Sequence, residues 1–593
     1  MSSKQVPKTK NLASLSASDS QLQFQSIYWL SLWLVIAYML AGVFGRDPWK
    51  ADEPYSFGMA LNFLQGLPWS VDWIVPYVGT DPFVEKPPLM YWTAALFAYL
   101  TSAFLPLQEG AQLAVIAWMA MTLITLSIMA RWLYGGRYRL PACMLLLGTL
   151  GVVVHVHKLI ADVPQLAGTV LALAGLVHFV IAQQAPSWKA GLMLGTGAGI
   201  AFMSKGVLVP GVLALTYLVS VIVLPAFRTR RAAVLLLWAA LAALPWLIVW
   251  PYLFWRAAEP LFIEWFWDNN FGRFFGFSEI PGSRSNYLQD IGLAIALAFP
   301  AGWLAVAEMF KRWRVYSATG DAQKALVFGG VRSEVKLARA VLWIYAITFY
   351  TVLLLMSASL REVYLLPVYP ALALLGVSIT LPTRLDRIWR AVVVIFFSAC
   401  GIWIWLCWGA LLAGRGQLMP ALFARWLPLD YVLPFSLGWL LAGLSLSGLW
   451  VCAIVWRVRL GAIATSFAGI TLVWGLLHTV LLPWFNEARS YRSAFKALQM
   501  ALPKQYDCLA VFNVGESERA MLHYFIGVKP LQTAALRATP CQAALILDKA
   551  DHRLAGFSPA EWQEIWRGGR MGDDNERFRA YLRRELSVDK NQR

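Results

Sequence analysis

The stretch that decides the fold class covers residues 27–44 and reads IYWLSLWLVIAYMLAGVF. It contains no charged residue, and a helix of about 20 apolar residues is long enough to cross the hydrocarbon core of a bilayer. Residues 439–456 form a second block of the same kind, WLLAGLSLSGLWVCAIVW. Such blocks recur along the chain. Because lipid offers no hydrogen-bond partner to backbone groups, they predict an integral membrane protein built from helices.

The overall composition supports the same fold class. Of the 593 residues, 59% are hydrophobic and 14% are charged, whereas a soluble domain has about 25% charged residues. Many of the 30 Trp lie at the ends of apolar blocks, where indole rings favour the membrane interface. The formal net charge is +17, but the basic residues cluster between apolar blocks. This pattern is typical of cytoplasmic loops, so we expect membrane lipids and no nucleic acid as partners.

The apolar blocks predict thirteen spans. They cover residues 26–45, 111–132, 139–157, 163–183, 189–204, 206–225, 232–254, 289–310, 339–358, 363–381, 391–413, 433–456 and 461–482. Residues 89–106 are also apolar and aromatic, but counting them as a span breaks the alternation of basic loops. We therefore interpret them as a helix that lies at the interface.

The charge pattern also predicts orientation and domain boundaries. The N-terminal segment 1–25 carries lysines but no cleavable signal, so we place it in the cytoplasm. The transmembrane domain then covers 26–482, with long outer loops at 46–110 and 255–288. An odd number of spans places the remaining segment, 483–593, on the outer side.

The segment 483–593 has the composition of a small α/β domain. Its pattern predicts helices at 492–502, 517–526 and 558–566, and buried strands at 508–513 and 543–547. The charged run from 573 onward indicates a final helix or a disordered tail. Cys508 and Cys541 lie in this domain and could pair if it is periplasmic, whereas the other four cysteines lie in apolar blocks.

The first outer loop contains two groups of ionisable residues next to apolar sequence. One is Lys50-Ala-Asp52-Glu53-Pro-Tyr55, and the other is Phe83-Val-Glu85-Lys86-Pro-Pro-Leu89. Ionisable groups at a membrane surface are costly to desolvate, which favours a functional role. Two structural alternatives remain open. Asp52 and Glu53 could cap the following helix, and Glu85 and Lys86 could form an interfacial ion pair.

Four further ionisable residues are predicted to lie at the same outer face: Asp162, Lys205, Arg273 and Arg361. Pairing or extension toward water would explain each one separately. Three cations at one membrane face suit a lipid phosphate or diphosphate headgroup, because Arg offers a bidentate fork and Lys a point charge.

Taken together, these motifs resemble those of a known family. The order Asp52-Glu53, Glu85-Lys86-Pro87, Asp162-x-Pro164, Ser204-Lys205-Gly206, Asn270-Phe-Gly-Arg273-Phe and Arg361…Tyr364-x-x-Pro367 is similar to the aminoarabinose transferase and protein O-mannosyltransferase group of GT-C glycosyltransferases. The resemblance covers about residues 30–380, and the layout resembles the bacterial lipid A aminoarabinose transferases in particular. It implies a GT-C fold in the bacterial inner membrane with a periplasmic active site. It also implies an undecaprenyl or other polyprenyl phosphate sugar donor, a glycan or glycolipid acceptor, and inversion at the anomeric carbon.

The resemblance also implies roles for individual residues. The catalytic set is Asp52, Glu53 and Asp162, with Asp52 beside the acceptor nucleophile. Asp52 would act as general base toward a hydroxyl, or would orient a phosphate nucleophile that is already ionised. The set that binds the donor phosphate is Lys86, Lys205, Arg273, Arg361 and Tyr364. Glu85 would bind a divalent metal or support the structure, and no other cofactor is implied.

Two positions depart from the family pattern. The family usually has an Arg two residues after the Asp-Glu pair, where this chain has Tyr55. It also usually has a His after the Arg273 motif, and residues 281–285 contain none. The departures weaken the case for a family-type zinc site, for lipid A as the acceptor and for aminoarabinose as the sugar. His155, His157 and His478 lie near outer span ends, where hydrogen-bonded interface histidines are common.

Two other classes of function fit a chain with many spans. A transporter or flippase of lipid-linked sugars would place charges in mid-span, or would contain paired discontinuous helices. A structural or assembly protein gives no reason for carboxylates and cations to recur at one face. The sequence therefore favours the glycosyltransferase over both.

Overall fold

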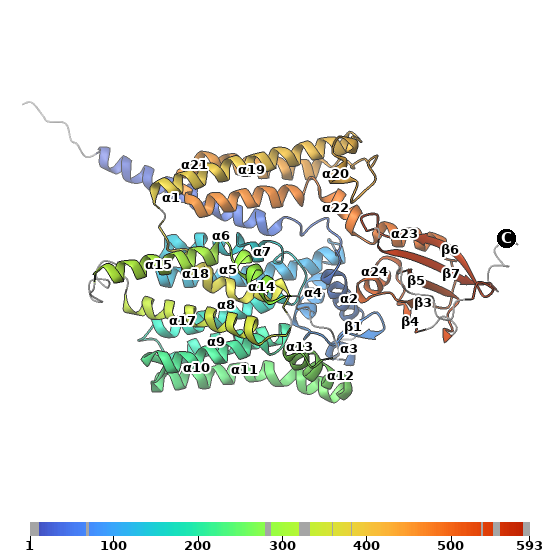
Figure 1. The fold of residues 1–593 in the computed structure, drawn as a ribbon, viewed down its shortest axis with the longest axis horizontal. Helices are drawn as coiled ribbons and strands as arrows, with labels where there is room; N and C mark the ends of the chain where they lie inside the picture. Colours follow the sequence, from blue (N-terminus) through green and yellow to red (C-terminus); the bar gives the residue numbers. More distant parts are fainter. Residues whose placement is uncertain are drawn as a thin grey trace, which may run out of the picture.

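Helices lying side by side make up most of the molecule, and a small sheet domain lies at one end (Figure 1). The computed structural model describes residues 11–66, 70–278, 286–319, 332–358, 360–380, 382–534, 538–548, 558–573 and 575–584. The charged stretch 585–593 and the His-free stretch 281–285 lie outside these ranges.

Six helical segments of the described residues are long and apolar enough to cross a membrane. They are α5 (Leu107–Tyr134), α8 (Asp162–Ile181), α11 (Arg230–Ala257), α17 (Ser333–Thr351) with η4 (Val352–Met356), α19 (Thr383–Leu412) and α21 (Leu437–Leu477). A seventh span is formed if α14 (Tyr287–Leu297) and α15 (Ala301–Thr319), which meet at 83°, are counted together. The predicted multi-pass helical membrane protein is thereby confirmed.

The other predicted spans coincide with shorter or less apolar helices. These are α1 (Asn11–Leu40), α6 (Arg139–Leu147), α7 (Leu150–Val153), α9 (Ser187–Lys205), α10 (Leu208–Val223), η5 (Glu362–Val368) and α18 (Tyr369–Gly376). The last two predicted spans, 433–456 and 461–482, overlap the two halves of α21, which is interrupted at Gly461, where φ is 76°. This left-handed backbone is readily adopted by glycine. The number thirteen stays a prediction, as does the interfacial placement of α4 (Leu89–Thr101).

Glycines allow three helices of the bundle to approach closely. Gly191, Gly195 and Gly199 recur every fourth residue along the α9 face that contacts α11, and Gly197 contacts α8. A Cβ atom at Gly195 would lie 2.0 Å from the carbonyl oxygen of Ala239. Small residues of this kind permit backbone contact between membrane helices. The packing fixes the start of α8 relative to the end of α9, where two site residues lie.

The C-terminal domain is a five-stranded sheet with helices. Its elements are α22 (Leu482–Arg489), α23 (Arg492–Ala501), β3 (Leu509–Phe512), α24 (Glu516–Ile526), β4 (Leu531–Gln532), β5 (Ala543–Asp548), β6 (Trp562–Gly568) and β7 (Arg577–Arg583). The strand order is β4-β3-β5-β7-β6. The first three strands are parallel, with Val511 opposite Leu545, and β7 is antiparallel to both neighbours. The predicted α/β domain is confirmed. The helices predicted at 492–502 and 517–526 correspond to α23 and α24, and the strands predicted at 508–513 and 543–547 correspond to β3 and β5.

Two predictions in this domain are wrong. Residues 558–566 do not form a helix, because β6 covers Trp562–Gly568, and the charged run after 573 contains strand β7. In β7, the buried Phe578 and Ala580 alternate with the more exposed Arg577 and Arg579, and Tyr581 and Leu582 are both buried. Alternation of apolar and polar residues is typical of a strand. In this segment the polar positions are arginines, so the sequence resembles a charged run and the alternation is easily missed. Pairing with β5 and β6 then decides the structure.

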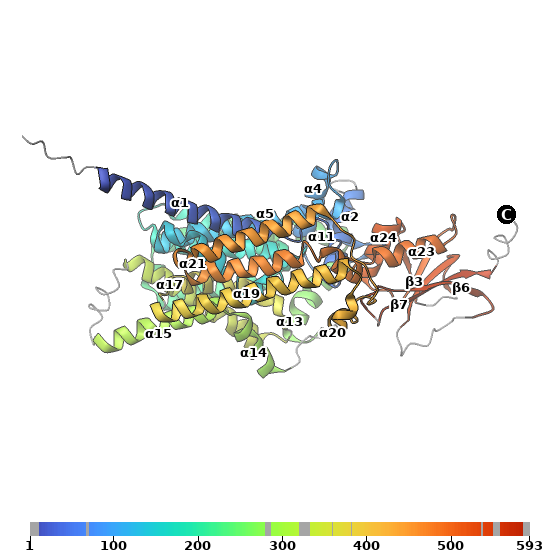
Figure 2. The same cartoon turned by 90° about the horizontal axis from the view of Figure 1, so that it is seen from above.

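Short elements lie at the end of the bundle that is nearer the sheet domain (Figure 1). They include α2 (Asp52–Gln65), α3 (Val71–Ile74), β1 (Tyr77–Val78), β2 (Asp81–Pro82), α12 (Glu259–Ile263), η3 (Glu264–Gly272) and α13 (Arg273–Phe275). Turns elsewhere form η1 (Gly136–Tyr138), η2 (Pro225–Phe227), η6 (Gly416–Leu418) and α20 (Pro420–Phe423). Figure 2 shows that α1 begins at the end of the molecule opposite the sheet domain. The predicted outer loops thus gather at the sheet end.

The structure pairs Cys508 with Cys541 in a disulfide and leaves Cys143, Cys400, Cys407 and Cys452 free. We therefore expect four reactive thiols in protein that is denatured without reductant, and all six after reduction. Thiol titration of the purified protein measures this number. Six thiols without reductant, in protein handled under non-reducing conditions, would contradict the pairing.

Candidate active site

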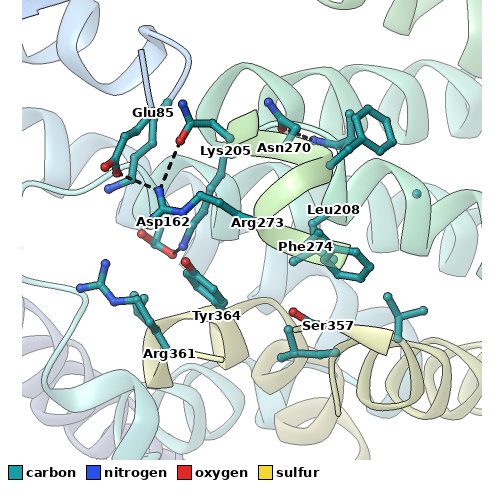
Figure 3. A pocket seen from close by; sticks show the side chains of 18 of the residues that line it. Glu85, Asp162, Lys205, Leu208, Asn270, Arg273, Phe274, Ser357, Arg361 and Tyr364 are labelled. Atoms are coloured by element: carbon teal, nitrogen blue, oxygen red, sulfur yellow. Dashed lines mark hydrogen bonds and ion pairs between the residues drawn. The ribbon is translucent and has the colours of Figure 1, made fainter. Parts of the chain in front are cut away.

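A cavity of about 250 Å³ lies at the sheet end of the bundle, between the outer loops (Figure 3). Eight of the nine predicted site residues line it: Asp52, Glu85, Lys86, Asp162, Lys205, Arg273, Arg361 and Tyr364. They come from six separate stretches of the chain. The structure therefore brings together residues that the sequence spreads over about three hundred positions.

Asp52 begins α2 and faces two cations. Arg361 Nη2 lies 3.2 Å from Asp52 Oδ2, and Tyr55 Oη donates a hydrogen bond to Asp52 Oδ1 at 2.9 Å. Lys86 Nζ in turn donates to Tyr55 Oη at 2.8 Å. Burial alone would raise the pKa of Asp52, but the charges of Lys86 and Arg361 outweigh it, so the pKa lies below its ordinary value. Asp52 is thus a carboxylate at neutral pH.

Asp162 and Lys205 form an ion pair between the first turn of α8 and the end of α9. Lys205 Nζ also lies 4.1 Å from the centre of the Tyr364 ring, which favours a cation over its face. The next residue, Gly206, has φ of 83°, and a Cβ atom there would lie 1.9 Å from Asn270 Oδ1. A glycine is therefore required at this position of the Ser204-Lys205-Gly206 motif.

Arg273 follows a π-helical segment, η3, a rare geometry that is frequent at functional sites. Its Nη1 atom lies 3.3 Å from Glu85 Oε2 and 3.4 Å from Asn269 Oδ1. Figure 3 shows Arg273 and Glu85 facing each other. Asn269 and Asn270 both line the cavity, and neither was among the predicted site residues. Their place immediately before the Phe-Gly-Arg273 motif is the signal that could have identified them.

The cavity combines charged and apolar walls. Four cations and three carboxylates lie among the lining side chains. The rest of the lining is mostly apolar and includes Leu208, Val212, Phe271, Phe274, Phe275, Val352, Leu353 and Val363. Such a lining suits an amphiphile with an anionic head and an apolar chain, because cations bind phosphate oxygens and the apolar walls cover hydrocarbon.

Glu53 lies outside the cavity lining. Its carboxylate accepts hydrogen bonds from Arg46 at 2.8 and 2.5 Å. It also accepts bonds from the Gln112 side chain and from the backbone N–H groups of Trp49 and Leu159. The residue is 3% exposed. These contacts favour a structural role over the predicted catalytic one.

The residues near Glu85 do not fit a metal site. Glu85 faces Arg273, and within the described ranges no three His, Cys, Asp or Glu side chains cluster closely enough to hold an ion. His157 Nε2 contacts the carbonyl oxygen of Tyr38, and His478 Nδ1 contacts that of Trp474. His155 lies 3.4 Å from Glu362, with no third ligand in a described position. We derive no step through a metal.

Comparisons with known proteins agree with the fold. Residues 85–255 match the model of the family described as dolichyl-phosphate-mannose-protein mannosyltransferase. The chain is similar to two crystal structures of ArnT from Cupriavidus metallidurans, one bound to undecaprenyl phosphate and one in the apo state. Sequence identities are 15% and 16%, each TM-score is 0.63, and the matches cover 94% and 95% of this chain and 98% of each ArnT chain. Among curated proteins, sequence comparison found no match. These matches show that the chain shares the fold of the ArnT structures, as the resemblance predicted.

The lowered pKa of Asp52 predicts a specific pH dependence of stability. An exposed Asp has a pKa of about 3.9, so the stabilisation from pairing Asp52 is complete above about pH 5 and is lost as the pH falls through the lower folded-state value. We expect the difference in thermal unfolding temperature between the wild type and Asp52→Asn to stay constant from about pH 5 to about pH 8, and to shrink below about pH 4.

The measurement is thermal unfolding in detergent over a pH series. Glu564→Gln, which changes an exposed carboxylate on β6, serves as the control for general pH effects. A difference that changes with a midpoint near neutral pH would show that the pKa of Asp52 is raised, and would contradict the geometry described above.

Proposed function

We propose that this chain is a membrane glycosyltransferase that moves a sugar from a polyprenyl phosphate to an acceptor at the sheet end of the bundle. The observation that carries the proposal is the cavity in which Lys86, Lys205, Arg273 and Arg361 meet beside apolar walls. The similar ArnT fold, found in a crystal structure bound to undecaprenyl phosphate, supports the same class of donor. The matched mannosyltransferase family supports sugar transfer from a lipid phosphate.

The geometry suits displacement of a lipid phosphate. The acceptor oxygen attacks the anomeric carbon, the bond from that carbon to the phosphate oxygen breaks, and polyprenyl phosphate leaves with the bonding electron pair. Negative charge grows on the departing phosphate, so cations already fixed around it lower the barrier. Arg273 and Arg361 offer planar forks, whereas Lys86 and Lys205 act as point charges.

Asp52 is the residue that we place beside the acceptor. If the nucleophile is a hydroxyl, its proton passes to the Asp52 carboxylate. If the nucleophile is an ionised phosphate, no proton moves and Asp52 orients it. The lowered pKa makes Asp52 a weak base and therefore favours the second role. Asp162, paired with Lys205, stands on the opposite side of the Arg273 side chain from Glu85 in Figure 3 and would contact the sugar.

We infer the cellular location and the acceptor from the resemblance to the aminoarabinose transferases. We place the protein in a bacterial inner membrane with its cavity and sheet domain in the periplasm, where a disulfide is stable. The acceptor is lipid A or another cell-envelope glycan or glycolipid. A flippase is not favoured, because the grouped charges come from helix ends, such as Asp52 of α2, Asp162 of α8 and Lys205 of α9, rather than from the middle of membrane helices.

Loss of a cavity charge should strongly reduce transfer without unfolding the protein. We expect Arg273→Ala and Asp52→Asn each to lower kcat by roughly 100-fold or more, by analogy with removal of one stabilising donor from an active site. The assay follows label from radiolabelled polyprenyl-phosphate sugars into an envelope lipid and glycan extract, with protein in nanodiscs. Arg567→Ala, an exposed arginine of β6, is the matched control and should keep full activity.

The assay can also refute the proposal. Normal transfer by either variant would remove that residue from the mechanism. If the wild type transfers no label from any donor and instead moves the donor across the bilayer in a flipping assay, the chain is a transporter.

A further inference from the structure

Lys50 lies two residues before Asp52, but its side chain points into the C-terminal domain. Its Nζ atom lies 2.7 Å from Glu518 Oε1 and also contacts Glu576 Oε1. The side chains of Glu518 and Glu576 are only 3% and 8% exposed. Carboxylates buried to this extent need a compensating cation, because an unpaired buried charge is strongly destabilising. An ion pair thus joins the start of the first outer loop, next to Asp52, to a domain more than four hundred residues away in sequence.

The carboxylates belong to a connected cluster. Tyr491 Oη donates hydrogen bonds to Glu518 at 3.0 Å and to Glu576 at 3.1 Å, and Arg570 pairs with Glu576 at 2.8 Å. Among the described residues, Lys50 is the cation paired with Glu518. Burial lowers the pKa of Lys50, but its bonds to the two carboxylates raise it above the ordinary value, so the group is charged at neutral pH.

Helix α24 of the same domain packs along α2 (Figure 1). Ser517 Oγ donates a hydrogen bond to the carbonyl oxygen of Ala51 at 2.7 Å. A Cβ atom at Gly58 would lie 2.5 Å from Cβ of Ala520, so the two helices are in backbone contact. The ring centres of Phe57 and Tyr524 lie 4.8 Å apart in an edge-on contact. The C-terminal domain, through α24, therefore packs against the helix that begins at Asp52.

We propose that the C-terminal domain positions Asp52 for catalysis, and that Lys50 is the positioning residue through which it does so. Lys50 and Ser517 hold the backbone immediately before α2, which leaves the Asp52 carboxylate directed at Arg361. Without that anchor, the first turn of α2 keeps the bonds of Glu53 but loses its ion pair with the C-terminal domain, so the Asp52 carboxylate can shift relative to the cavity. The catalytic part of this inference rests on the proposed glycosyl transfer.

The expected effect is on turnover rather than on donor affinity. Displacement of a reacting group by about 1 Å can cost roughly 100-fold in rate. The four cations that we assign to the donor phosphate come from other segments of the chain, so they keep their backbone positions, although Arg361 and Lys86 also contact Asp52 and Tyr55 of α2. Loss of Lys50 should therefore lower kcat and leave the Kd for polyprenyl phosphate nearly unchanged.

Three variants separate positioning from general stability. Lys50→Met removes the anchor and leaves Glu518 as an unpaired buried carboxylate, which lowers Tm. Lys50→Met combined with Glu518→Gln removes that penalty, so Tm recovers while the anchor is still missing. Lys50→Arg keeps the charge and the bridge. We expect kcat to fall roughly 10- to 100-fold in the first two variants and to be largely retained in the third. Hydrogen exchange at residues 52–58 should be faster in the first two.

Recovery of kcat together with Tm in the double variant, or wild-type kcat in Lys50→Met, would overturn the inference. The wild type serves as the reference for the proposed function in the same assay. If it transfers no sugar, the proposed function fails, and hydrogen exchange then decides the anchoring alone. Unchanged exchange at residues 52–58 in Lys50→Met would overturn it.

Discussion

A buried ion pair between Arg46 and Glu53 fixes the corner where the first membrane helix leads into the outer loop. The guanidinium also donates to the carbonyl oxygens of Gly42 and His157, so its hydrogen bonds tie three chain segments together. Two buried charges are tolerable only when both are well bonded, as they are here. Because Glu53 adjoins Asp52, this corner sets where α2 begins and which way the Asp52 carboxylate faces. The cavity depends on that placement.

The cavity itself holds six of its seven charges in ion pairs before any ligand binds. Arg361 faces Asp52, Lys205 faces Asp162, and Arg273 faces Glu85. This arrangement limits the cost of keeping cations beside apolar walls. When a phosphate enters, it replaces the carboxylate as the partner of a cation. The cations therefore pass from one anion to another and do not have to be desolvated unpaired. The carboxylates released by that exchange become available to the sugar and the acceptor, which links donor binding to the state of Asp52.

The sequence was sufficient for the features that recur locally. Apolar blocks predicted the membrane helices, charged groups in the outer loops and at span ends predicted seven of the lining residues, and the family resemblance added Tyr364. It was insufficient where tertiary contacts decide. Glu53 is an acidic residue in the same motif as Asp52, so the sequence does not distinguish their roles. In the structure Glu53 pairs with Arg46 and does not line the cavity. Strand β7 is concealed by its arginines and is formed by pairing with β5. Lys50 gives no sign in sequence that its partners lie in the C-terminal domain.

The central claim is that the cations around Arg273 form a lipid phosphate site. A structure of the protein with polyprenyl phosphate in nanodiscs tests it most directly. The account predicts the phosphate within hydrogen-bonding distance, about 3 Å, of Lys86, Arg273 or Arg361, with the chain along Leu208, Phe274 and Leu353. A phosphate bound elsewhere on the molecule, with the cavity still closed by its own ion pairs, would contradict the account.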